Sequence, residues 1–272
     1  MKTVKIQGGL GNQLFGLAFA RSLRLASGAR VALDVSSYRW DRFGSRFMVG
    51  DIAQRIGGLT VVDRPLHGHR LSAAVMRHAP FGAGLFVCEQ LPAPPAFEMA
   101  AYARRGGYFN GYWQDEAYIL GGDAWTDLLG DFVRARATAA EDWGRDAVVI
   151  HFRTYKEESH PVFSRTPGRE YFLDAIAAVE QRTGPTSRVW VVSDDPVLAL
   201  QRIGDLGRET VAVPARGWAD DMALLLNASA LILTNSSFSW WVGYAGRAKI
   251  ATYPRRGELF HYPVPAARFT CC

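Results

Sequence analysis

The chain has 272 residues, of which 49% are hydrophobic and 21% charged, and a formal net charge of +5. This length and composition are typical of a globular protein with one large domain or two of ordinary size. Lys and Arg nowhere form a run of five residues, which excludes a dedicated nucleic-acid-binding arm, so we expect no nucleic-acid partner. An anionic small molecule, or contact with an acidic membrane surface, accounts for the basic charge equally well.

Cysteine spacing and hydropathy indicate a reducing compartment and no membrane span. Cys88, Cys271 and Cys272 have the spacing of neither a disulfide framework nor a metal site. The first residues enter a strand at once, without the apolar core of a signal peptide. No window approaches the roughly 18 apolar residues of a transmembrane helix. We therefore expect a cytoplasmic protein whose contact with a membrane is at most peripheral.

The first half of the chain predicts a β-α-β opening followed by a region of weaker signal. Strands are expected over 3–7 and 31–35, with an amphipathic helix between them that ends at Gly28. From residue 39 to residue 95 the pattern is interrupted by Arg, Gly and Pro. The other strands expected in this half are 59–62, 85–89 and the aromatic segment 107–114. A polar, alanine-rich stretch over 134–146 marks a boundary, so the predicted domains are 1–140 and 141–272.

The turn after the first strand carries glycines that bring backbone close to another group. Gly9 and Gly11 match two positions of the dinucleotide fingerprint, but Leu14 stands at the third, where close helix–strand packing needs glycine. A nicotinamide enzyme is therefore disfavoured. The turn is either a ligand site, with the amides of Asn12 and Gln13 beside it, or a tight turn without a ligand.

The second half alternates strands and helices with few interruptions. The expected strands are 147–152, 188–192, 210–213, 230–233 and 249–253, and the expected helices are 171–181, 196–203, 220–228 and 238–244. Asp195 and Pro196 have the residue types of an N-cap and of a first helical position. Such alternation predicts a parallel sheet with helices on both faces, whose ligands bind at the carboxyl ends of the strands.

Polar residues follow the first two strands of this half. Arg153 presents a rigid donor fork that matches a phosphate, and a structural ion pair is the alternative. His151 orients a phosphate oxygen or donates a proton, and a satisfied core histidine is the alternative. Ser193 and Asp194 end the next strand, where a carboxylate can accept from a ribose or a base edge. Asp195 is better explained as a cap.

A third turn, 234–237, leads from an apolar strand into an aromatic helix. The first backbone N–H groups of that helix, together with its dipole, suit an anion. Alternatively, Asn235 or Ser236 only caps the helix, while Trp240 and Trp241 fill the core. No Asp-x-Asp triplet occurs in the chain. A departing diphosphate would then be stabilised by arginine and backbone donors, and we expect no metal site.

Four groups of residues together match the motifs of one known family. They are Gly8–Phe15 with Ala18–Arg21, Gly111–Gln114 with Tyr118, Val192–Pro196, and Asp220–Met222 with Asn235–Trp241. These motifs resemble those of glycosyltransferase family 11, the α-1,2-fucosyltransferases, over nearly the whole chain, and the last group is the most specific. Membrane-anchored members begin with a membrane span that this chain lacks. We therefore expect a bacterial, cytoplasmic form, at most peripheral to the inner membrane.

The resemblance implies a GT-B fold, in which two Rossmann-like α/β domains face each other across a cleft. It implies inverting transfer of L-fucose from GDP-fucose, without metal or cofactor, to an oligosaccharide or glycoconjugate, at position 2 of a galactose. Residues 1–140 would form the acceptor side and residues 141–272 would bind the GDP-sugar. Arg153, which matches the family's phosphate-binding arginine, and His151 are the expected catalytic residues. The expected donor-binding residues are Gly9, Gly11, Asn12, Gln13, Arg153, Ser193, Asp194, Asn235, Ser236, Ser237, Phe238 and Ser239.

One segment departs from the family. The family pattern is His-x-Arg-Arg-Gly-Asp, whereas residues 151–156 are His-Phe-Arg-Thr-Tyr-Lys. Phosphate binding by the first arginine is unaffected, but the acceptor, the general base and the sugar stay open. The alternatives are another nucleotide sugar on the same scaffold, or a glycan-binding protein without catalysis. Candidates for the base are Glu157, Glu158, Asp34 and His151, or a water relay.

Overall fold

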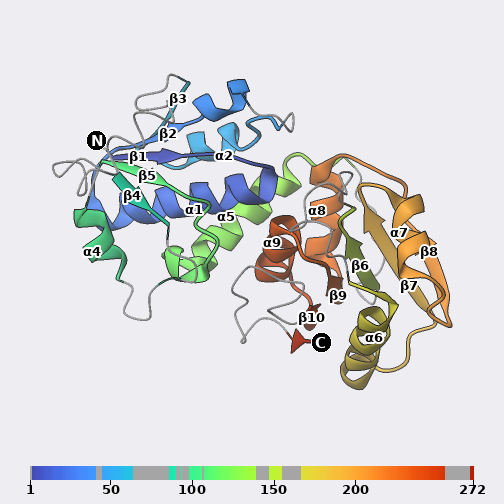
Figure 1. Ribbon diagram of the computed structural model, residues 1–272. Coiled ribbons are helices and arrows are strands. Elements are labelled where there is room, and N and C mark those ends of the chain that lie inside the picture. Colours follow the sequence, from blue (N-terminus) through green and yellow to red (C-terminus); the bar gives the residue numbers. More distant parts are fainter. Residues whose placement is uncertain are drawn as a thin grey trace. The chain divides into compact units, whose positions relative to one another are not determined.

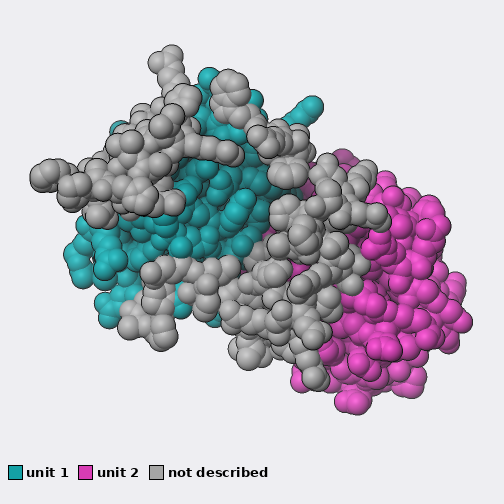
Figure 2. Space-filling model, viewed as in Figure 1, with its two compact units in different colours: residues 1–125 teal, residues 126–272 magenta. Residues whose placement is uncertain are grey.

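The computed structural model describes residues 2–40, 45–63, 86–89, 93, 98–105, 107–138, 147–154, 167–254 and 270–272. The chain forms two compact units, Met1–Trp125 and Thr126–Cys272, drawn in teal and magenta in Figure 2. Each unit contains its own β-sheet, and every strand pairing described is parallel. The predicted domain boundary, between residues 140 and 141, lies outside the described residues.

The first unit has a five-stranded sheet with the order β3-β2-β1-β5-β4. Its strands are β1 (Lys2–Lys5), β2 (Val31–Asp34), β3 (Leu59–Val62), β4 (Phe86–Cys88) and β5 (Tyr108–Asn110). Its helical elements are α1 (Leu10–Ser27), η1 (Ser36–Trp40), α2 (Gly50–Arg55), α4 (Met99–Arg104), η2 (Glu116–Tyr118) and α5 (Gly122–Arg134), which continues into the second unit. β1 and β5 are neighbours although far apart in sequence, so the strand order reverses between them.

The long helix α1 packs against the first sheet and supplies much of the core of this unit (Figure 1). Its side chains Phe15 and Phe19 are fully buried, as is Trp113, whose ring stacks on Phe19 with the centroids 3.8 Å apart. Burial of each such side chain contributes about 1.5–3 kcal/mol. Gly28 ends the helix with φ 67°, a left-handed conformation that glycine adopts without strain, so the predicted helix end is confirmed.

The second unit has a six-stranded sheet with the order β11-β10-β9-β6-β7-β8. Its strands are β6 (Val148–Phe152), β7 (Arg188–Ser193), β8 (Glu209–Ala212), β9 (Ala230–Leu233), β10 (Ile250–Tyr253) and β11 (Thr270–Cys271). Its further helices are α6 (Arg169–Thr183), α7 (Pro196–Ile203), α8 (Trp218–Asn227) and α9 (Ser237–Ala245). Counted from β6, the order is 3-2-1-4-5-6, that of Rossmann folds, with its reversal between β6 and β9.

Helices lie on both faces of the second sheet. On the face covered by α6 and α7, Ile150 and Phe152 of β6 join a buried cluster with Phe172 of α6. Successive side chains of a strand point to opposite faces. His151 therefore points to the other face, where it contacts Ser239 of α9. The alternation of side chains along β6 therefore places this histidine beneath α9.

The predicted α/β class with two Rossmann-like domains is confirmed. Asp195 caps α7 by accepting from the Leu198 N–H at 3.1 Å, and Pro196 is the first residue of that helix, as predicted. The aromatic strand predicted over 107–114 is wrong in its second half, because β5 ends at Asn110 and a sharp turn follows. The short helices α2 and α4 were not predicted. In the described part of the chain, no helix has both the length and the hydropathy needed to cross a membrane.

Asp34, a candidate base, is a buried carboxylate at the end of β2. It is 1% exposed, and it accepts from the Tyr108 hydroxyl at 2.8 Å and from the Ser36 N–H at 2.9 Å. Burial and the neighbouring carboxylate raise the pKa of Tyr108, so its hydroxyl stays protonated and keeps donating. Asp34 therefore stabilises the fold and is unsuited to take a proton from a substrate.

We expect Tyr108→Phe to destabilise the protein by about 2 kcal/mol, because it removes a donor from a buried carboxylate. Tyr102→Phe is the matched control, since the Tyr102 hydroxyl donates to the uncharged Cys88 carbonyl at 3.1 Å. Its loss should lower the free energy of unfolding by only about 1 kcal/mol. Urea unfolding followed by circular dichroism measures both, and equal losses would contradict the charged-acceptor explanation.

Candidate functional site

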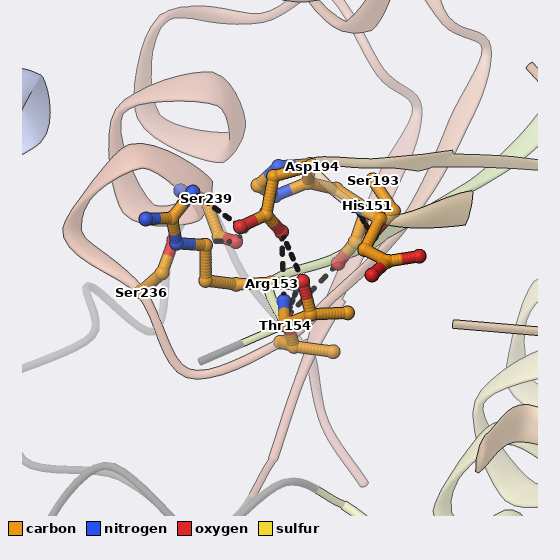
Figure 3. A network of polar contacts seen from close by, with 9 residues as sticks. His151, Arg153, Thr154, Ser193, Asp194, Ser236 and Ser239 are labelled. Atoms are coloured by element: carbon orange, nitrogen blue, oxygen red, sulfur yellow. Dashed lines mark hydrogen bonds and ion pairs between the residues drawn. The ribbon is translucent and has the colours of Figure 1, made fainter. Parts of the chain in front are cut away.

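The turns after β6, β7 and β9 meet at the carboxyl edge of the second sheet, where its strand order reverses (Figure 3). β6 pairs with β7 on one side and with β9 on the other, so Phe152 lies opposite Ser193 and His151 opposite Leu233. The parallel pairing thereby brings together all of the site residues predicted in this unit. They are His151, Arg153, Ser193, Asp194, Asn235, Ser236, Ser237, Phe238 and Ser239.

Thr234 joins the turn after β9 to the turn after β6. Its backbone N–H and its hydroxyl both donate to the His151 carbonyl, at 3.2 Å and 3.0 Å. Its Oγ1 also accepts from the Arg153 N–H at 3.0 Å. These bonds extend the pairing of β6 and β9 beyond the last residues of the strands. They fix the point at which Arg153 leaves the sheet.

Arg153 and Asp194 form an ion pair between the ends of β6 and β7, with Nη1 and Oδ2 2.9 Å apart. The other oxygen of Asp194 accepts from the backbone N–H and the hydroxyl of Thr154, at 2.8 Å and 2.7 Å. Figure 3 shows the carboxylate held between these two partners. The Arg153 side chain is nevertheless 46% exposed. The ion pair considered as an alternative to phosphate binding is therefore present, and it orients a guanidinium that solvent can still reach.

Thr154 is a member of this cluster that the sequence alone did not single out. It is 2% exposed, and it holds Asp194 through both of its donors. Its only sequence signal is its place directly after Arg153, where the family pattern has a second arginine. A small hydroxyl residue there holds the neighbouring carboxylate instead of adding a second positive charge.

His151 is buried and hydrogen-bonded to Ser239, with Nδ1 and Oγ 2.7 Å apart. The centroid of its ring also lies 5.1 Å from the ring centroid of Phe238. Burial, assisted by the positive charge of Arg153, lowers the pKa of His151 to about 3, and Asp194 only partly opposes this. The imidazole is therefore neutral at physiological pH. Such a group is suited to orient its neighbours rather than to donate a proton.

Ser236 is the N-cap of α9. Its Oγ accepts from the Ser239 N–H at 3.0 Å and lies 3.1 Å from the Ser239 Oγ, and its carbonyl accepts from the Tyr253 hydroxyl at 2.9 Å. The capping alternative is thus realised by Ser236. The start of the helix is therefore held by two contacts, the Ser236 cap and the hydrogen bond from Tyr253 of β10.

Capping by Ser236 leaves the anion-binding interpretation of α9 in place. The capped N–H belongs to Ser239, whereas those of Ser237 and Phe238 come earlier in the helix, where backbone donors have no acceptor within the helix. Trp240 and Trp241 are fully buried, so the aromatic part of the segment forms core, as the alternative interpretation held. The polar first turn and the apolar remainder of α9 therefore have separate roles.

Asp221, in the first turn of α8, belongs to a motif that the sequence analysis matched to the family, but it was not among the predicted donor-binding residues. Burial raises its pKa to about 6; Arg216 opposes the shift, while the charges of Asp220 and Asp194 add to it. Asp220 instead accepts from the Thr138 N–H at 2.6 Å. Neither acid caps the helix, because the N-cap is Gly217 and no side-chain cap bond forms there, so the capping explanation of these acids is wrong. Their place in a family motif was the available signal.

The predicted residues of the first unit lie in the turn between β1 and α1. Gly8 has φ 75°, and a Cβ there would lie 2.6 Å from the Asn12 Nδ2, so this position requires glycine. Gly9 is the extended N-cap of α1, where a Cβ would meet nothing within 4 Å, and Gly11 is buried in the first turn. The buried Gln13 amide donates to two backbone carbonyls and accepts from a backbone N–H. Gln13 therefore shapes the turn.

The turn after β5 is strained and lies beside the glycine turn. Trp113 has φ 60° and is the one non-glycine residue with positive φ in the described part of the chain. The Glu89 carboxylate accepts from the N–H groups of Tyr112 at 2.6 Å and of Gln114 at 2.8 Å. The Gln114 Nε2 donates to the Asn12 Oδ1 at 2.8 Å. The ends of β4 and β5 and the start of α1 are thereby joined.

No protein-family model and no curated protein matches the chain. Among solved structures, the α-1,6-fucosyltransferase NodZ from Bradyrhizobium, soaked with GDP-fucose, is 16% identical in sequence, with a TM-score of 0.47. The match covers 90% of this chain and 92% of the NodZ chain. POFUT1 in complex with GDP is 12% identical, with coverages of 96% and 98% and a TM-score of 0.38. A mutant of FUT1 from Arabidopsis thaliana in complex with GDP is 12% identical, with coverages of 91% and 69% and a TM-score of 0.47. At these values, the assignment of two Rossmann-like units rests on the strand order of the chain itself.

We expect the His151 imidazole to stay neutral at pH 5, which long-range proton–nitrogen NMR of histidine-labelled protein measures directly. Its pKa of about 3 in the folded state lies below the ordinary 6.5, so as the pH falls the unfolded state binds the proton first. Stability should therefore be complete above about pH 6.5 and decline towards pH 3. His151→Gln identifies the resonance and should lack this part of the decline. A ring that becomes charged near pH 6 would show the explanation to be wrong.

Proposed function

We propose that this protein is an inverting, metal-independent fucosyltransferase that moves L-fucose from GDP-fucose to an acceptor glycan, at position 2 of a galactose. The observation that carries the proposal is the Arg153 guanidinium, held half-exposed at the carboxyl edge of a Rossmann-type sheet, on a residue whose N–H donates to Thr234 in the turn before α9. Such edges and helix starts bind the phosphates of nucleotides. The resemblance to the motifs of glycosyltransferase family 11 indicates that the transferred sugar is fucose. A GT-B arrangement of the two units is part of the same proposal.

The leaving group of the proposed reaction is GDP, whose terminal phosphate gains charge as its bond to fucose breaks. Arg153 offers a planar, permanently charged fork, and the first turn of α9 offers backbone N–H groups. Both are fixed before a ligand arrives, the arginine by Asp194 and the helix start by the Ser236 cap. Donors fixed in this way stabilise developing charge without reorganisation during the reaction.

Asp194 fits a positioning role better than the ribose-binding role first considered for it. One of its oxygens accepts from Arg153 and the other accepts twice from Thr154, so most of its acceptor positions are used within the protein and at most one is left for a ribose hydroxyl. Asp221 is close enough for Asp194 to raise its pKa, and with a pKa of about 6 it is ionised at neutral pH. We propose that the Asp221 carboxylate accepts hydrogen bonds from the N–H groups on the edge of the guanine base.

In the proposed reaction, the acceptor hydroxyl attacks C1 of fucose from the face opposite GDP. A new C1–O bond forms, the C1–O bond to the phosphate breaks, and its electron pair leaves with GDP, so the configuration inverts. The hydroxyl proton passes to a base. Asp34 and His151 are unsuited, because one is buried in hydrogen bonds and the other is a very weak base. Glu157 and Glu158, which lie outside the described residues, remain candidates, as does a water relay.

The first unit supplies the acceptor side in this proposal, in keeping with the domain assignment 1–140. Gly9, Gly11 and Asn12 face the donor, while Gln13 contributes by fixing the shape of their turn. Ser193, whose Oγ accepts from the Asp195 N–H at 3.1 Å, supports the turn that carries Asp194. We place the enzyme in the cytoplasm, with contact to the inner membrane that is at most peripheral.

Another nucleotide-sugar donor is the second candidate function, and the contact of Thr154 with Asp194 favours it. Where the family pattern supplies a second arginine, this chain offers a hydroxyl that is used internally. A thermal-shift panel of GDP-fucose, GDP-mannose and UDP-sugars separates the candidates, and GDP-fucose should give the largest shift. A glycan-binding protein without catalysis would instead bind acceptors and release no GDP with any of them.

Metal independence follows in this proposal from the fixed donors that meet the leaving charge. Within the described ranges, no group of three or more His, Cys, Asp or Glu side chains is arranged to hold a metal ion. A mass-spectrometric screen of acceptors with GDP-fucose, run with and without EDTA, tests reaction and requirement together. Equal product with EDTA is expected, whereas loss of product that magnesium restores would refute this part.

Arg153→Ala should lower kcat by a factor of hundreds, because losing one preorganised contact to the leaving group raises the barrier by about 3–4 kcal/mol. Arg188→Ala is the matched control. Arg188 is 50% exposed against 46% for Arg153, and it pairs with Glu209 at 2.7 Å, but it lies at the opposite end of the sheet, at the start of β7. Release of GDP from GDP-fucose measures both. Wild-type turnover by Arg153→Ala would remove this arginine from the mechanism.

Asp221→Asn should raise stability at pH 7.5 while weakening GDP binding. The pKa of Asp221 is raised from 3.8 to about 6, so the folded state binds the proton more readily, and wild-type stability declines as the pH rises between these values. The gain in melting temperature should thus be full above about pH 6 and vanish near pH 4. Calorimetric titration with GDP gives the affinity. A pH-independent gain contradicts the pKa, and unchanged affinity contradicts the guanine assignment.

A further inference from the structure

We propose that the strained turn Gly111–Gln114 is a binding subsite for a pyranose ring, with the Tyr112 side chain as its stacking surface. The existence of the subsite rests on the geometry of the first unit. Its identification as the place of the acceptor sugar rests on the function proposed above.

The turn lies where parallel sheets bind their ligands. β1 and β5 are neighbours, and the strand order of the first sheet reverses between them. The turns that follow these strands therefore meet at the carboxyl edge of the sheet, the usual ligand position in open α/β folds. Two side-chain bonds join them, from Gln114 to Asn12 at 2.8 Å and from the Gln7 Nε2 to the Gly111 carbonyl at 3.5 Å. Arg153 occupies the equivalent edge of the second sheet.

The backbone of the turn is held in a conformation that is unfavourable for its residue. A φ of 60° at a bulky residue such as Trp113 costs of the order of 1–3 kcal/mol. Its side chain is fully buried, stacked on Phe19, with an edge-on contact to Tyr118 at 5.2 Å between centroids. Backbone strain of this kind persists where the surroundings enforce it, and it gathers at ligand sites.

Glu89 enforces the strained conformation from the end of β4. Its two carboxylate oxygens accept from the N–H groups on either side of Trp113, one at 2.6 Å and one at 2.8 Å. The Glu89 side chain passes so close to Gly111 that a Cβ at that position would clash with it. The position of Tyr112 is therefore set before a ligand arrives, which lowers the entropy lost on binding.

Tyr112 presents a flat apolar surface at this fixed position. It is 40% exposed and is the one aromatic among the large hydrophobic side chains exposed in the described part of the chain. Its ring covers Gly8, where a Cβ would lie 3.3 Å from the Tyr112 Cε1. The amides of Gln114 and Asn12 adjoin it, and an amide offers donors and acceptors beyond the single bond that each uses with the other. An aromatic face beside fixed amides suits the C–H face and the hydroxyl groups of a pyranose.

The test measures sugar binding and GDP binding separately in four proteins: wild type, Tyr112→Ala, Tyr112→Phe and Leu25→Ala. Leu25→Ala is the control, because it removes a 56% exposed apolar side chain from the last turn of α1 in the same unit. Saturation-transfer NMR uses methyl β-galactoside, methyl β-glucoside and methyl N-acetyl-β-glucosaminide as probes, and calorimetry measures GDP. We expect at least one glycoside to bind with equal affinity to wild type, Tyr112→Phe and Leu25→Ala. The same glycoside should bind Tyr112→Ala about tenfold more weakly. The affinity for GDP should be the same in all four proteins.

Two outcomes overturn the subsite: equal glycoside binding by Tyr112→Ala, or no binding of any of the three probes by wild type. Tyr112→Leu, which keeps apolar bulk without a flat ring, gives the same answer should the alanine variant fail to fold. The GDP arm reports on the proposed function alone. Binding of glycoside without GDP would leave the subsite and remove the donor site, and binding of GDP without glycoside would do the reverse.

Discussion

The parallel pairing of β6 with β9 is the constraint on which the candidate site depends. The two strands come from distant parts of the chain, and the sheet reverses its order between them. Thr234 carries their pairing past the ends of the strands through bonds to the His151 carbonyl and the Arg153 N–H. A guanidinium and the first turn of a helix thereby acquire a fixed relation to each other, which no local sequence could impose. Asp194, from the adjoining strand, then completes the orientation of the arginine.

Each unit places polar turns at the point where its sheet reverses, and the two points differ in chemistry. In the second unit the edge carries a positive charge and the start of α9, groups that match phosphate. In the first unit the edge carries amides and an exposed aromatic ring on a turn held by Glu89. One topological rule thus gives two edges of different chemistry, because the residues that follow the strands differ between the two sheets.

Much of the second unit could be predicted from the sequence, because its buried strands are largely apolar and two of its helices begin at recognisable capping residues, Asp195 and Ser236. The edge that holds Arg153 followed from the same alternation. The turn at Trp113 could not be predicted, since its aromatic pattern suits a strand and its φ is imposed by Glu89, which is distant in sequence. The contact of Thr154 with Asp194 was hidden for a similar reason, because hydroxyl and carboxylate residues are common in any turn.

The hydrogen-bonded series His151, Ser239 and Ser236 has a property that a charged series would lack. Each member is uncharged, and each side chain can act as donor or acceptor, the histidine through its choice of tautomer. The direction of the hydroxyl and imidazole bonds can therefore reverse without moving net charge through the interior. Beneath the first turn of α9, the series can therefore point its dipoles in either direction at the same net charge.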